Sequence, residues 1–219
     1  MHTPDLDYVK PRTLIFDLDG TISDPFEGIS KSVNYALESI DVEAVDPERI
    51  RSMIGPPLTE IFEYFLGDVS EERMHFLVDK YRERYASIGY RENVIYAQIP
   101  EVIEALSSSG YELGICTSKR ADYASDIVEM FGLAAHFSFI DGGDVGVHKA
   151  DQLERLVTNG ISADTAAMIG DRHFDIGAAK RNGLTSVGVS WGFGNEEELN
   201  TAAPDHLLHS PDELLELFT

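Results

Sequence analysis

Two aspartates, separated by a single leucine, stand at the end of an apolar run in residues 13–21 (TLIFDLDGT). The apolar residues suit a buried strand, and acids at the open end of such a strand reach the crevice where sheet proteins bind ligands. Asp17 and Asp19 can face the same side, where two close carboxylates share a proton or hold a divalent cation. A lone Asp-Gly-Thr run is also ordinary turn chemistry, so the pair needs support from elsewhere in the chain.

Three later segments supply that support, each close to an apolar run or a helical pattern. Hydroxyls and backbone N–H groups at a strand-to-helix turn can bind anions. Thr117 and Ser118 directly follow the apolar run 113–116 and can play this part. Lys149 begins a helical pattern, where a cation is unfavourable unless an anion pairs with it. Asp171 ends a third apolar run, and Asp175 follows four residues later, so both can serve one hard cation. Each segment alone also fits a helix cap or a solvated charge, but their joint occurrence indicates a reactive site.

The elements that must position these groups alternate along the chain. Short apolar runs predict buried strands, and amphipathic spacing from about residue 99 onward predicts helices between them. Strands that alternate with helices form βαβ units, so we predict an α/β fold with a doubly wound parallel sheet. The predicted strands are 14–16, 113–116, 137–140, 166–169 and 186–189.

The stretch between the first two predicted strands is far too long for a single crossover helix. It shows helical spacing at 29–40 and 76–88, and Asp46 followed by proline is typical of a helix start. We therefore predict a helical cap domain over 24–93, inserted into an α/β core domain of residues 1–23 and 94–219. Tyr81 and Tyr85 form a stripe that we interpret as helix core.

The composition narrows the classes of partner. The 219 residues include 17 Lys and Arg against 39 Asp and Glu, a formal net charge of -22. Such a charge repels nucleic acids and anionic membrane surfaces, so we expect neither as a partner. The single cysteine, Cys116, excludes an internal disulfide and suits a buried position. Residues 1–7 lack a basic region with an apolar core, so we expect a cytoplasmic protein. We also expect a monomer or weak homodimer.

The four chemical segments together resemble the motifs of the haloacid dehalogenase superfamily hydrolases, over nearly the whole chain. Residues 17–21 resemble the first motif, Thr117 the second, Lys149 the third, and Asp171 with Asp175 the fourth. Residues 55–58 (GPPL) resemble a cap element of the phosphoglycolate-phosphatase-like members and of related 5′-nucleotidases. The chain departs from many relatives in carrying Ser118 in place of asparagine and Ala150 in place of proline.

The resemblance implies a Mg²⁺-dependent phosphomonoester hydrolase that works through an aspartyl-phosphate. Asp17 is then the nucleophile, and Asp19 protonates the leaving group and later activates water. Thr117, Ser118 and Lys149 hold the phosphoryl group. The implied Mg²⁺ ligands are the Asp17 carboxylate, the Asp19 backbone carbonyl, Asp171 and Asp175.

The implied substrate is a small phosphorylated metabolite, with phosphoglycolate as the leading type. Substrate contacts are expected from Gly20, Thr21, Gly55 and Pro56, and Arg51 is a candidate partner for a carboxylate or a second phosphate. Three alternatives stay open: a 5′-nucleotidase, a β-phosphoglucomutase-like phosphosugar mutase and, outside the enzymes, a phospho-accepting switch. Asp19 and the inserted domain count against the switch, which needs neither a leaving-group acid nor a lid.

Overall fold

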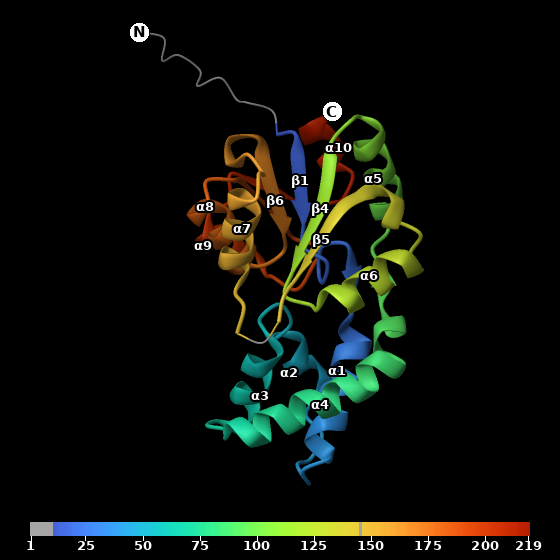
Figure 1. The fold of residues 1–219 in the computed structure, drawn as a ribbon, viewed down its shortest axis with the longest axis vertical. Helices are drawn as coiled ribbons and strands as arrows, with labels where there is room; N and C mark the ends of the chain where they lie inside the picture. The colour runs from blue at the N-terminus through green and yellow to red at the C-terminus, as the bar shows by residue number, and fades with distance from the viewer. Residues whose placement is uncertain (1–10, 145) are drawn as a thin grey trace.

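The computed structural model describes residues 11–144 and 146–219, so the first ten residues of the predicted core domain lie outside the described residues. The described part contains a six-stranded, all-parallel sheet in the order β5-β4-β1-β6-β7-β8, which confirms the predicted α/β fold (Figure 1). Its strands are β1 (Thr13–Phe16), β4 (Glu112–Thr117), β5 (Phe137–Gly142), β6 (Ala166–Gly170), β7 (Thr185–Val189) and β8 (His206–Leu208).

Strand β1 lies between β4 and β6 in the interior of the sheet and is buried on both faces. Leu14 and Phe16 pack into one hydrophobic cluster, and Ile15 packs into another on the opposite face. Successive side chains of a strand point to opposite faces, so a continuous apolar run is what a strand between two helical layers requires. The same reasoning accounts for the short apolar runs of β4 and β6, its two neighbours.

Helices cover both faces of this sheet (Figure 1). Helices α5, α6 and α10 supply the cluster that contains Leu14, and α7 and α8 supply the cluster that contains Ile15, with α9 against α8. The bounds are α5 (Ile99–Ser108), α6 (Ala121–Met130), α7 (Lys149–Thr158), α8 (His173–Arg181), α9 (Glu196–Ala202) and α10 (Glu213–Phe218). Short 3₁₀ helices occur at Gly89–Glu92, Ala134–His136 and Ala163–Thr165.

A second group of helices lies beyond the carboxyl ends of the central strands (Figure 1). It comprises α1 (Phe26–Glu38), α2 (Pro47–Arg51), α3 (Leu58–Leu66) and α4 (Glu71–Ser87). These helices share their own hydrophobic cluster, whose buried members run from Ile29 to Tyr85. A two-stranded antiparallel ladder, β2 (Ser23–Asp24) with β3 (Val94–Ile95), joins this group to the sheet. The ladder falls at the predicted limits of the cap, although those limits themselves stay a prediction.

Local signals account for much of the helical group. Asp46 caps α2 by accepting the backbone N–H of Glu48 at 3.0 Å, as its position before proline predicts. Tyr81 and Tyr85 are buried in the cap cluster, as their interpretation as helix core predicts, and they also line the cavity described below. Helix α3 and strand β8 were not among the predicted elements. In the described part of the chain, no helix is long and apolar enough to cross a membrane.

The cap cluster yields a stability prediction at α3. Phe62 is fully buried in it, so Phe62→Ala removes a large ring and leaves a cavity. We expect the free energy of unfolding, measured by chemical denaturation, to fall by about 3–5 kcal/mol. Tyr64, 58 % exposed on the same helix, is the matched control, and Tyr64→Ala is expected to cost less than about 1 kcal/mol. Equal losses in the two variants would contradict the cap core described here.

Candidate active site

The carboxyl ends of the three central strands bring together residues that are far apart in sequence. Phe16, the last residue of β1, lies beside Ile115 of β4 and Ile169 of β6 in the parallel register. Asp17, Thr117 and Asp171 therefore leave the sheet at the same edge. This is the edge at which parallel α/β sheets form their ligand crevice.

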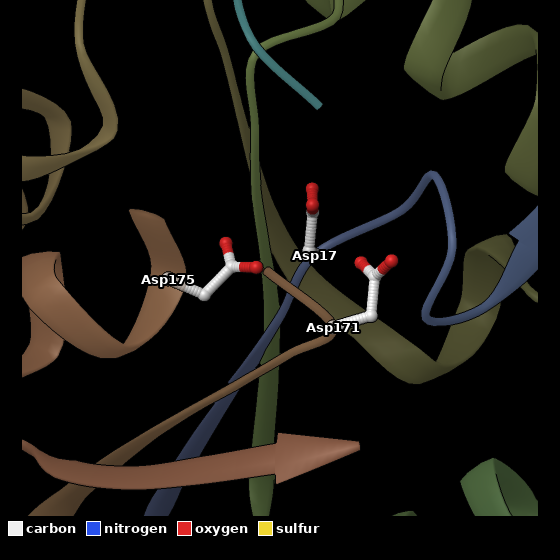
Figure 2. A group of neighbouring side chains, drawn as sticks. All are labelled: Asp17, Asp171 and Asp175. Atoms are coloured by element: carbon white, nitrogen blue, oxygen red, sulfur yellow. The ribbon is translucent and has the colours of Figure 1, made fainter. Parts of the chain in front are cut away.

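Three carboxylates crowd together at this edge (Figure 2). Asp17, Asp171 and Asp175 are buried, and each offers an oxygen within 4.8 Å of the others. Burial, followed by repulsion from Asp175 and Asp17, raises the pKa of Asp171 well above its usual range. Closely spaced oxygen ligands with excess negative charge are what a hard divalent cation requires. The observed grouping therefore fits the ligand set that the sequence predicts.

The loop after β1 is shaped to let Asp171 approach. Gly20 has a φ of +84°, and a Cβ built there would lie 2.2 Å from Asp171 Oδ2, so only glycine fits. Asp171 accepts hydrogen bonds from the Thr21 hydroxyl at 3.4 Å and the Phe193 backbone N–H at 2.7 Å. Gly20 thus leaves room for this carboxylate and Thr21 donates to it. Neither residue is among those that line the cavity, and their expected contact with substrate stays a prediction.

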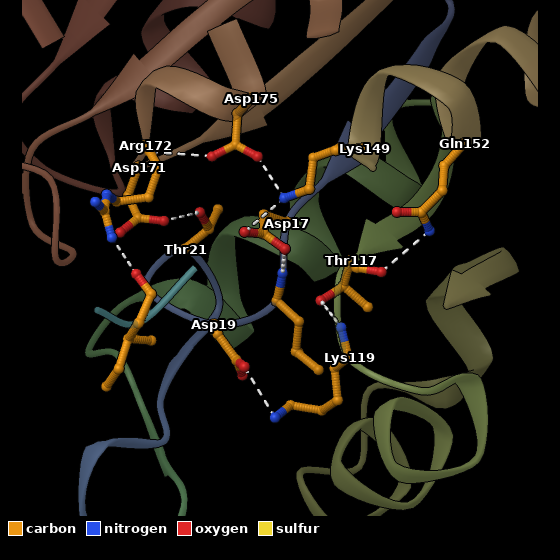
Figure 3. A network of polar contacts seen from close by, with 12 residues as sticks. Asp17, Asp19, Thr21, Thr117, Lys119, Lys149, Gln152, Asp171, Arg172 and Asp175 are labelled. Carbon is orange, nitrogen blue, oxygen red and sulfur yellow. Dashed lines mark hydrogen bonds and ion pairs between the residues drawn. The ribbon is translucent and has the colours of Figure 1, made fainter. Parts of the chain in front are cut away.

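Lys149 provides the positive charge inside the carboxylate group (Figure 3). Its ammonium lies 2.8 Å from Asp17 Oδ2 and also pairs with Asp175 Oδ1. Burial acts to lower the pKa of Lys149, but Asp17 and Asp175 outweigh it and raise that pKa above its usual value. The lysine therefore stays charged at the first turn of α7, where the carboxylates offset the unfavourable helix dipole.

Asp19 occupies a different position from the three crowded acids. Its carboxylate lies 2.8 Å from the Lys119 ammonium through Oδ2, whereas Oδ1 is buried with no hydrogen-bond partner among the described residues (Figure 3). Burial raises the pKa of Asp19, and the charge of Lys119 opposes the rise in part. A carboxyl with a raised pKa and a free oxygen can hold and release a proton.

Thr117 is the last residue of β4 and Ser118 follows it, and both line the same cavity as Asp17 and Asp19. The Thr117 hydroxyl accepts the backbone N–H of Lys119 at 3.2 Å. Gln152, buried on α7, donates to the Thr117 carbonyl oxygen at 3.1 Å and so fixes the turn from behind. No local pattern singles out Gln152 beyond its place one turn after Lys149.

The cavity lies between the helical cap and the sheet edge. Gly55 and Pro56, which we expect to contact substrate, are among the residues that line it, and Arg51 is not. The Arg51 guanidinium lies 3.6 Å from both Asp24 and Glu48. The full lining is Asp17, Asp19, Ile29, Ile54, Gly55, Pro56, Pro57, Leu58, Ile61, Tyr81, Arg82, Tyr85, Thr117, Ser118, Lys119, Arg120, Tyr123 and Asp144.

Arg172 links the site to the cap, a role that the sequence analysis missed. Its guanidinium donates to the Ile54 carbonyl oxygen and forms an ion pair with Glu198 at 2.8 Å. A Cβ added at Gly55 would lie 3.2 Å from the Arg172 side chain, so the cap loop packs directly on the arginine. The loop that contains Gly55 and Pro56 is thereby held over the sheet edge.

Comparisons with known proteins agree with this architecture. A 5′-nucleotidase of Pseudomonas aeruginosa is 39% identical over 197 residues, covering 88% of this chain and 89% of its own length. A phosphoglycolate phosphatase of Aquifex aeolicus is 29% identical, with 94% and 96% covered. The crystal structure of a predicted phosphatase from Clostridium acetobutylicum superposes with a TM-score of 0.89 at 35% identity, covering 95% of this chain and 98% of that one.

The family assignment follows from a match that spans most of the sheet and the entire cap. Residues 14–189 match the model of the haloacid dehalogenase-like hydrolases, from β1 to the end of β7. This range contains the acid pair after β1, the hydroxyl after β4, the lysine of α7 and the acids after β6. The chain belongs to the haloacid dehalogenase-like hydrolase family.

Proposed function

We propose that this protein is a Mg²⁺-dependent phosphomonoesterase that forms an aspartyl-phosphate on Asp17. The observation that carries the proposal is the position of Asp17, which faces the cavity beside Asp19, Thr117 and Ser118 while Lys149 touches its carboxylate at 2.8 Å. The relatives named as phosphatases and as a 5′-nucleotidase support the same reaction class.

The proposed reaction has two displacements at phosphorus. An Asp17 oxygen attacks the phosphorus, the bond to the leaving oxygen breaks, and Asp19 gives its proton to that oxygen. Water then attacks the phosphorus of the aspartyl-phosphate, Asp19 takes the water proton, and the Asp17 carboxylate is restored with release of phosphate. Thr117, Ser118 and the nearby backbone N–H groups hold the phosphoryl oxygens, and Lys149 offsets their charge.

The residues present fit the divalent cation that the family implies. Asp17, Asp171 and Asp175 would hold it, with the Asp19 backbone carbonyl as a further ligand, and burial leaves their combined negative charge unshielded by water. When bound, Mg²⁺ lessens the repulsion between a carboxylate and a phosphate dianion and polarises the phosphoryl oxygens. The Thr21 hydroxyl and the Phe193 N–H orient Asp171 for this role.

Within this reaction class, the aromatic wall of the cavity favours nucleoside 5′-monophosphates, the substrates of a 5′-nucleotidase. Tyr81 and Tyr85 of the cap stack at 5.3 Å, and Tyr123 of the core meets Tyr85 edge-on at 5.3 Å. The two arginines in the lining already face carboxylates, Arg82 at 3.2 Å from Asp144 and Arg120 at 2.6 Å from Asp122. The base of a nucleotide suits this wall better than the carboxylate of phosphoglycolate does, because aromatic rings are stabilised by stacking on one another.

The nucleophile assignment predicts that Asp17→Asn abolishes turnover. An amide cannot attack phosphorus as a carboxylate does, so we expect steady-state hydrolysis of 4-nitrophenyl phosphate with Mg²⁺ to fall by about 10⁴-fold or more. Circular dichroism should show that the fold persists. Asp126→Asn, at an exposed position of α6, is the control and should keep wild-type turnover. Undiminished activity of the Asp17 variant would contradict the proposal, and a sub-stoichiometric burst from the wild type would favour the switch.

A panel of substrates separates 5′-nucleotidase activity from phosphoglycolate phosphatase activity. We expect kcat/KM for nucleoside 5′-monophosphates to exceed that for phosphoglycolate by about tenfold, since stacking on an aromatic side chain is worth roughly 1–3 kcal/mol per base. Tyr123→Ala should reduce the advantage and leave phosphoglycolate unaffected. A higher kcat/KM for phosphoglycolate would instead support phosphoglycolate phosphatase activity. Isomerisation of a sugar phosphate without release of phosphate would favour the mutase.

A further inference from the structure

Lys119 has no part in the four motifs, yet its side chain lies inside the site. It follows Ser118 directly, and only 6 % of the side chain is exposed. Its ammonium lies 2.8 Å from Asp19 Oδ2 and donates a hydrogen bond to the Tyr85 hydroxyl, also at 2.8 Å (Figure 3 shows the contact with Asp19). One buried cation therefore contacts both the candidate proton donor of the core and a helix of the cap.

Tyr85 is held firmly in its position on α4. It is 1 % exposed, stacks on Tyr81 and meets the ring of Tyr123. The Lys119 ammonium also lies 4.7 Å from the centre of the Tyr85 ring, within the range of a cation–π contact. One cap residue thus contacts the lysine through its hydroxyl and the adjoining ring, so the place of the ammonium depends on where α4 lies.

The contact with Lys119 leaves one oxygen of Asp19 available. Oδ2 accepts the ammonium, and Oδ1 is buried without a hydrogen-bond partner among residues 11–144 and 146–219. Asp19 lines the cavity together with Asp17, where a leaving group has to lie. Holding one oxygen of a carboxylate fixes the direction of the other, and proton transfer in a transition state depends strongly on such alignment.

We propose that Lys119 is a positioning residue that aligns Asp19 for proton transfer to the leaving group, and that Tyr85 makes this alignment depend on the cap. When α4 covers the site, the Tyr85 hydroxyl and ring hold the ammonium, and the ammonium holds Asp19 Oδ2. When α4 moves away, Lys119 loses both contacts and Asp19 loses its fixed orientation. The inference rests on the proposed function, because it assigns the control of the proton donor in that reaction.

The dependence of the rate on the leaving group tests this inference. An alkyl phosphate needs its leaving oxygen protonated, whereas 4-nitrophenolate leaves readily as an anion. The measurement is kcat/KM with Mg²⁺, which reports the first phosphoryl transfer, across aryl and alkyl phosphates of rising alcohol pKa. For Lys119→Met we expect a loss of about 10²-fold on alkyl phosphates and less than about tenfold on 4-nitrophenyl phosphate.

Conservative variants keep the test decisive even if Lys119→Met folds poorly. Tyr85→Phe keeps the ring and removes only the hydroxyl, and we expect a loss of about tenfold confined to the alkyl phosphates. Tyr64→Phe is the matched control, because it removes the hydroxyl of a cap tyrosine that is 58 % exposed on α3 and does not line the cavity, and it should keep the wild-type leaving-group dependence. Lys80→Met removes a lysine that pairs with Glu83 at 2.7 Å on the same helix and should leave activity unchanged.

Each outcome has one meaning. A wild-type protein that hydrolyses none of these esters would overturn the proposed function itself. An active wild type with the same leaving-group dependence as Lys119→Met would overturn the inference and leave the proposed function standing. A change in Lys119→Met with none in Tyr85→Phe would overturn the dependence on the cap. A steeper dependence in both variants, absent from Tyr64→Phe, would support the whole inference.

Discussion

The site depends on keeping three carboxylates close together in a buried position. Asp17, Asp171 and Asp175 repel one another there, and burial together with this repulsion raises the pKa of Asp171. Lys149 offsets part of this charge by touching Asp17 and Asp175. The remaining negative charge makes the site suited to a divalent cation, and in the proposed reaction that cation allows a carboxylate to approach a phosphate.

The parallel sheet and its loops bring these carboxylates close together. Register between β1, β4 and β6 places their carboxyl ends level, so each supplies one polar group to the same edge. Gly20 has no side chain, and a Cβ at this position would collide with Asp171. The cap closes the site from the other side, and Arg172 and Lys119 connect it to the residues that border the carboxylates. Two largely buried cations, Arg172 and Lys119, therefore connect the cap to the core.

Much of this could be predicted from sequence because the signals are local. Apolar runs marked β1, β4 and β6, and acids or hydroxyls directly after them had to meet at one edge. Strand β8 spans only three residues, too few for a periodic pattern, and α3 lies between turn residues that obscured its start. Arg51 next to the cap loop suggested a substrate contact, but only the fold shows its guanidinium beside Asp24 and Glu48. Lys119, Gln152 and Arg172 act through partners distant in sequence, which no local pattern records.

The central claim is that the three crowded carboxylates form one cation site at the nucleophile. Anomalous diffraction from crystals soaked in Mn²⁺ tests it most directly, with Asp171→Asn as the comparison. We expect a single manganese peak bounded by Asp17, Asp171 and Asp175 in the wild type, and its loss or marked weakening in the variant. A peak elsewhere, or none at these carboxylates at saturating Mn²⁺, would show that the three acids do not form a cation site.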